Sequence, residues 1–208
     1  LIDMKQTRKI KLPEDISEIT LEQSKRYIEI ANREDIDDVA KTQRIVKLFT
    51  GMKFSDIENL HLGDYETITT HIGNAMNKDV EFKNRFTLDG VEYGFIPNLN
   101  DITTGEYIDL STHGTSVDNL HKVMAILFRP VISTGMNDTY EIEPYRVDKE
   151  RQEIMKQAPM NIVNGMMVFF CLLSRELQNH ILKSMEENQE EVKKELKDTL
   201  VSGDGMSA

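Results

Sequence analysis

Apolar residues recur at helical spacing in two segments that share one plan. The segments DDVAKTQRIVKLFTGM (37–52) and VDNLHKVMAILFRPV (117–131) each predict an amphipathic helix that ends in Leu-Phe and is closed by Gly51 or Pro130. A further helix precedes each one. Thr20 and Thr103 are predicted as the N-caps of these two preceding helices, because Gln or Glu follows at the third helical position and completes a capping box.

The last helix of each half begins after an Asx residue in this pattern. Asp64 is predicted to cap a helix from Tyr65 to about Met76, and Asn161 is predicted to cap a helix from Ile162 onward. Pro13 precedes Thr20 as Pro97 precedes Thr103, so the order of proline, capping threonine and helices repeats along the chain, which favours an internal duplication. Chance recurrence of such common signals is the alternative.

Two short stretches break the helical pattern and predict β-hairpins. Asp89-Gly90 stands between two apolar runs, which is typical of a two-residue type I′ turn, so a hairpin is expected at about 84–96. The extra sequence VISTGMNDTYEIEPY predicts a second hairpin at about 131–145, near Gly135. The expected fold is mainly α with small β-hairpins, an α+β class, with helical halves at 1–80 and 81–200.

The C-terminal part predicts a long amphipathic helix. From Ile162 to about Leu200 the helical pattern can continue for roughly forty residues, or on the order of 60 Å, so part of it should project from a small domain. Its apolar stripe supplies the candidate partner contacts Leu177, Ile181, Met185, Val192 and Leu196. A solvated terminal helix is the alternative, and residues 201–208 are expected to be disordered.

Composition narrows the classes of function. The chain has 208 residues and a formal charge of −11, which argues against nucleic acid and anionic membranes as partners. The single cysteine, Cys171, excludes an intramolecular disulfide and fits a reducing cytoplasm. The polar start does not predict a signal peptide, and the longest apolar run, at 162–173, is shorter than the roughly 18 residues of a membrane span.

Motifs that carry chemistry are not found in the sequence. The five histidines are scattered without metal-ligand spacing, and no phosphate-binding loop or nucleophile elbow occurs. We therefore expect no catalytic residues, no metal and no cofactor, and a protein that is not an enzyme.

The segment TGMKFSDIENLHLGDYE, from Thr50 to Glu66, resembles the first active-site box of tyrosine recombinases. Lys53 stands where those enzymes have a catalytic arginine, and lysine cannot grip a phosphate in the same bidentate way. The segment also fits a helix-turn-helix, although DYETITTHI carries no Lys or Arg to meet DNA. The alternative function is thus a DNA-directed regulator or a degenerate tyrosine-recombinase-like protein, with Lys41, Arg44, Lys47 and Lys53 as its cations.

Phe86 to Val131 carries three motifs in order: LDG-x-x-Y, IT-x-GEY and HK-x-MA-x-L-[FY]-RP. In this the chain resembles small tail-assembly or minor virion proteins encoded among the morphogenesis genes of tailed bacteriophages. The resemblance implies a structural protein or assembly chaperone whose partners are other phage structural or tail proteins, or a second copy of itself. It also implies a location in the host cytoplasm during assembly, or in the virion.

Overall fold

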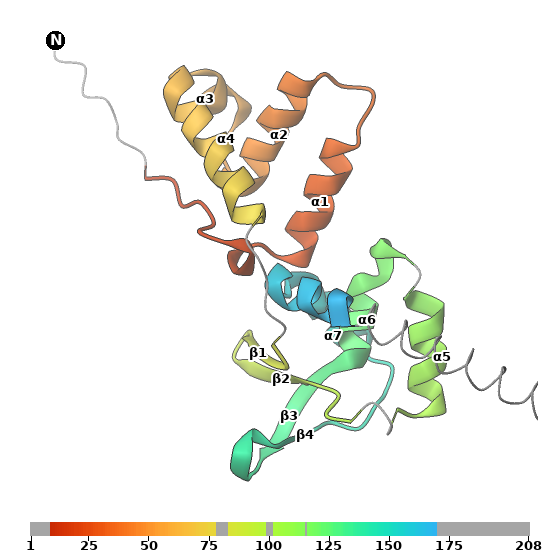
Figure 1. Ribbon diagram of the computed structural model, residues 1–208. Coiled ribbons are helices and arrows are strands. Elements are labelled where there is room, and N and C mark those ends of the chain that lie inside the picture. The colour runs from red at the N-terminus through yellow and green to blue at the C-terminus, as the bar shows by residue number, and fades with distance from the viewer. Residues whose placement is uncertain (1–8, 78–82, 99–101, 115, 170–208) are drawn as a thin grey trace, which may run out of the picture. The chain divides into compact units, whose positions relative to one another are not determined.

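The computed structural model describes residues 9–77, 83–98, 102–114 and 116–169. These residues are mostly helical with one small antiparallel sheet, which confirms the expected α+β class (Figure 1). The described residues up to Gly165 belong to one compact unit, and residues 166–169 belong to a second unit. The division of the chain at about residue 80 stays a prediction.

The helices of the N-terminal part are α1 (Leu21–Ala31), α2 (Asp38–Thr50), α3 (Phe54–Glu58) and α4 (Leu62–Met76). Helix α2 shows why they begin and end where they do. Asp37 Oδ1 accepts a hydrogen bond from Ala40 N at 2.7 Å, and Gly51 closes the helix in the left-handed region at φ 68°. Helix α2 contacts α1, α3 and α4 around a core that includes Val46 and Ile57 (Figure 1).

The remaining named elements are β1 (Arg85–Leu88), β2 (Val91–Phe95), α5 (Thr104–His113), α6 (Leu120–Leu127), β3 (Phe128–Thr134), β4 (Tyr140–Ile142) and α7 (Lys149–Ile154). The strands pair in the order β1-β2-β3-β4, and each neighbouring pair is antiparallel. A 3₁₀ turn, Met155–Gln157, follows α7, and residues 160–169 are again helical.

The β1–β2 hairpin has the turn that its sequence predicts. Asp89 and Gly90 both adopt positive φ, at 50° and 77°, as a type I′ turn requires. Behind the turn, Phe86 lies 5.6 Å from Tyr93 and 5.2 Å from Phe128 between ring centroids. This aromatic group joins the hairpin to the start of β3.

The passage from α6 to β3 corrects the predicted role of Pro130. The expected helix ran into Phe128 and was closed by Pro130, whereas the structure ends α6 at Leu127 and places Pro130 within β3, opposite Tyr93. The residue before a proline is driven to extended backbone, so Arg129 cannot continue the helix. The second hairpin therefore begins at Phe128, before the predicted 131.

The predicted helix caps are right at the threonines and wrong at the Asx residues. Thr20 and Thr103 cap α1 and α5 in full capping boxes. Helix α4 begins at Leu62 after His61, so Asp64 lies in its first turn, where a negative charge favours the helix N-terminus. Asn161 lies inside the last helix, because helical backbone already begins at residue 160.

An isolated β-bridge between Thr20 and Pro159 explains that earlier start. Leu21 N donates to Ala158 O at 2.9 Å, and Met160 N donates to Ile19 O at 2.8 Å. Because the bridge fixes Pro159 in extended backbone, the helix can start directly after it. The beginning of α1 and the beginning of the last helix are therefore held together by backbone hydrogen bonds.

Candidate functional site

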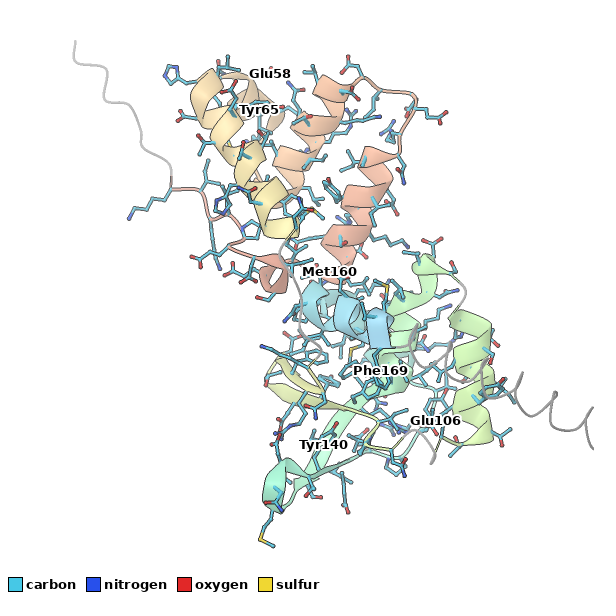
Figure 2. All side chains as sticks on the ribbon, viewed as in Figure 1. Glu58, Tyr65, Glu106, Tyr140, Met160 and Phe169 are labelled. Carbon is cyan, nitrogen blue, oxygen red and sulfur yellow. The ribbon has the colours of Figure 1, made fainter. Side chains whose placement is uncertain are left out.

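Two of the three buried charged residues in the described part of the chain, Glu106 and Arg129, meet between α5 and β3. The side chains of Glu106 and Arg129 are 3% and 8% exposed, and Arg129 Nη2 lies 2.9 Å from Glu106 Oε1 (Glu106 is labelled in Figure 2). The other carboxylate oxygen, Oε2, accepts hydrogen bonds from Thr103 N and Thr103 Oγ1, both at 2.7 Å. One glutamate thus caps its own helix and pairs with a strand.

A second buried arginine organises the entry to α7. Arg151 Nη2 donates to Glu143 Oε2 at 2.7 Å and lies 3.6 Å from Asp148 Oδ2. Asp148 is the N-cap of α7 and accepts a hydrogen bond from Arg151 N at 3.0 Å. This hydrogen bond is the main cause that lowers the pKa of the Asp148 carboxyl, so the cap stays ionised.

A tyrosine completes the polar cluster. The hydroxyl of Tyr145 donates to the carboxylate of Asp109 on α5, and the Arg129 guanidinium lies 5.9 Å from the centre of the tyrosine ring. Burial, and then the hydrogen bond to Asp109, raise the pKa of Tyr145. The phenol therefore stays protonated and acts as a donor.

This polar cluster has the chemistry of a structural centre. Burial lowers the pKa of Arg129, with Arg151 as a further cause, but a guanidinium is protonated throughout the physiological pH range and keeps its charge. Within the described part of the chain, Glu106 Oε1, Arg129 Nε and Arg151 Nη1 have no hydrogen-bond partner, so the ion pair lacks full alignment. The cluster joins α5, β3 and α7, and its charges have partners within the fold.

Several motif residues of the segment from Phe86 to Val131 have structural roles. Asp89 and Gly90 make the turn, Thr103 and Glu106 make the cap, and Arg129 pairs with Glu106. The last of these pairings was not predicted from the sequence. The available signal was one arginine in the otherwise apolar run MAILFRPV, since a charge in such a run needs a buried partner.

The β3–β4 hairpin presents apolar side chains to solvent, from its tip and from strand β3. Met136 is 88% exposed and Ile132 is 59% exposed. Gly135 N donates to Thr139 O at 2.8 Å, and Thr139 Oγ1 donates to Met136 O at 2.9 Å, so the tip is internally hydrogen-bonded. The Arg85 guanidinium on β1 also pairs with the Asp138 carboxylate. The hairpin expected near Gly135 is therefore present, and its turn is held by hydrogen bonds and an ion pair and carries an exposed methionine.

The four cations of the DNA-directed alternative have separate environments. Lys41 lies 3.7 Å from Asp38, and Arg44 Nη1 donates to Ala40 O at 3.3 Å. Lys47 lies over the Phe54 ring, and Lys53 is exposed beside the end of α2. Lys47 and Lys53 are exposed, whereas Lys41 and Arg44 are only partly exposed.

Other predicted positions have the following outcomes. The candidate partner contacts Leu177, Ile181, Met185, Val192 and Leu196 lie outside the described residues. Among the residues that are described, no group of three or more His, Cys, Asp or Glu side chains is arranged to hold a metal ion.

In the described ranges, no helix combines the length and apolar character needed to cross a membrane.

Comparisons with protein-family models, with curated proteins and with solved structures found no match for this chain.

Proposed function

We propose that this chain is a non-enzymatic structural or assembly protein of a tailed bacteriophage that acts by binding other virion or tail proteins. The observation that carries the proposal is the tip of the β3–β4 hairpin. A side chain as apolar as Met136, 88% exposed on a hydrogen-bonded turn, suits burial against a partner. Methionine adapts to irregular apolar surfaces, and a turn that is already ordered loses little entropy on binding.

The polar cluster supports the same proposal because its buried charges have a structural role. Its most buried charges serve to hold α5, β3 and α7, which makes a rigid base for the hairpin. The Phe86–Val131 resemblance supplies the phage context. Both a chaperone that leaves the particle and a component that stays in it would use such a surface.

Two finer features belong to this proposal. We infer that the halves of the chain arose by duplication, since Thr20 and Thr103 make equivalent capping boxes ahead of equivalent helix pairs, α1–α2 and α5–α6. We also infer a long C-terminal helix whose stripe at Leu177, Ile181, Met185, Val192 and Leu196 adds a second contact surface.

A capture experiment with matched variants tests the proposal. The full chain is immobilised and incubated with dissociated virion and tail proteins of the phage that encodes it. The variant I132S/M136S should lose at least about tenfold in capture with little change in melting temperature, because both side chains are mostly exposed. The control V39S/V147S removes two apolar side chains that are 67% and 66% exposed elsewhere, and it should bind as the wild type does.

Each outcome has one meaning. Equal capture by the two double variants would overturn the role of the hairpin. Failure of the wild-type chain to capture any particle protein would overturn the proposed function.

A further inference from the structure

Three lysines gather around one hollow beside the end of α2. Residues 9–13 run in non-helical backbone past the turn that follows this helix, and a cavity of about 200 Å³ lies between them. Lys9, Lys11 and Lys53 line the cavity, together with the apolar side chains of Ile10 and Met52. We call this site the lysine hollow. It combines a positive rim with an apolar wall.

Two acidic residues, Glu18 and Asp56, partly compensate the positive charge of the lysine hollow. Lys9 and Lys53 are exposed, and Lys11 Nζ reaches Glu18 Oε2 only at 3.6 Å, with its own side chain 88% exposed. Such exposed pairs contribute little and stay open to exchange. Asp56 is the acidic residue of the wall. In a chain whose net charge is −11, three lysines lining a hollow with a single acidic residue give it a local excess of positive charge.

We propose that the lysine hollow binds an acidic segment of a partner protein, with Asp or Glu carboxylates on Lys9 and Lys53 and a neighbouring apolar side chain against Ile10 and Met52. This inference rests on the proposed function and names the chemistry of one partner surface. Lysine ammonium groups attract carboxylates without demanding one fixed geometry, which suits a flexible acidic peptide.

The size of the site favours a peptide over nucleic acid. A hollow of about 200 Å³ is smaller than the roughly 300 to 1,000 Å³ of small-molecule pockets, so it takes one or two side chains at a time. A nucleic-acid strand needs cations along an extended track, whereas neighbouring α4 carries no Lys or Arg in its sequence LGDYETITTHIGNAM.

Fluorescence anisotropy on the full chain tests the proposal. The probe is a short fluorescein-labelled peptide of alternating glutamate and leucine. Its controls are the same peptide with glutamine for glutamate, and single-stranded DNA of equal charge. The double reversal K9E/K53E is compared with K83E/K149E, which changes the net charge equally at two exposed lysines outside the hollow. The wild type should bind the glutamate peptide saturably, and K9E/K53E should weaken binding at least about tenfold.

The expected result also includes near wild-type binding by K83E/K149E and little binding of the glutamine peptide. Equal loss in both double variants would overturn the site, because it would show an effect of net charge alone. Tighter binding of the DNA through the same lysines would overturn the choice of partner. If the peptide does not bind but phage proteins are still captured, only the proposal for the lysine hollow is overturned. If the peptide binds but no phage protein is captured, the proposed function is overturned.

Discussion

The two carboxylate oxygens of Glu106 meet different partners, which makes this residue a test of how the fold is joined. Oε2 accepts from Thr103 and satisfies the start of α5, while Oε1 faces Arg129 on β3. A glutamine could keep the first role, since capping boxes accept Gln as well as Glu. It would leave the buried guanidinium without its counter-charge. The two roles can therefore be separated by substitution.

Glu106→Gln should lower the free energy of unfolding by about 3 to 5 kcal/mol, the usual cost of leaving one member of a buried ion pair alone. Thr103→Ala removes only the cap and should cost about 0.5 to 2 kcal/mol. Urea unfolding monitored by circular dichroism gives both values. A smaller loss for Glu106→Gln than for Thr103→Ala would show that the ion pair does not matter for stability.

Gly94 marks a close approach within the sheet. A Cβ added there would lie 2.4 Å from Cε2 of Tyr140, and the hydroxyl of that tyrosine donates to Phe95 O at 2.8 Å. Gly94→Ala should therefore displace the ring and lower the melting temperature. Gly73→Ala on α4 meets no atom within 4 Å and should stabilise by about 0.5 to 1 kcal/mol. Calorimetry that ranked the two variants in the opposite order would contradict this packing.

At the scale of elements, helix α7 depends on an ionised cap. The hydrogen bond from Arg151 N holds the pKa of Asp148 below its unfolded value, which is about 3.9. A lowered folded pKa means that the cap stabilises the fold above the unfolded pKa. That stabilisation is lost as the pH falls through the folded pKa.

Asp148→Asn should make the stability of the protein less dependent on pH below about pH 5, because the substituted cap cannot be protonated. Melting temperatures between about pH 7 and about pH 3 measure the slope. The control Asp38→Asn alters a carboxylate that is 99% exposed and should leave the wild-type slope. An equal slope for Asp148→Asn and the wild type would contradict the assigned role.

Elements with strictly local signals were predictable from the sequence. Asp89-Gly90 defines its turn within two residues, and the threonine caps need only the side chain three positions on. The prediction that Asn161 caps the last helix was wrong because Pro159, two residues earlier, is fixed by a β-bridge to the distant residue Thr20. The Glu106–Arg129 ion pair could likewise not be predicted, since no local sequence pattern shows which strand a buried glutamate will face.

At the scale of the whole molecule, distant parts of the sequence share one packed junction. The backbone bonds around Pro159 tie the start of α1 to the residues after α7. Ile19, Met155 and Ala158 are fully buried there. The described residues up to Gly165 should therefore unfold together.

Met155→Ala should cost about 2 to 5 kcal/mol and should speed hydrogen exchange in α1 and α6 alike, because a cavity at the junction weakens both. The control Met136→Ala alters a side chain that is 88% exposed and should change stability by no more than about 0.5 kcal/mol. Faster exchange in α6 alone, with α1 unchanged, would show that the two regions unfold independently.

The measurement that tests the central claim most directly is quantitative mass spectrometry of the tagged chain purified from phage-infected cells throughout infection. Our account predicts that virion or tail proteins of the same phage co-purify in fixed ratio, in particles or in assembly intermediates, and that I132S/M136S lowers this ratio. A chain that co-purifies with no phage particle protein at any stage would contradict the account.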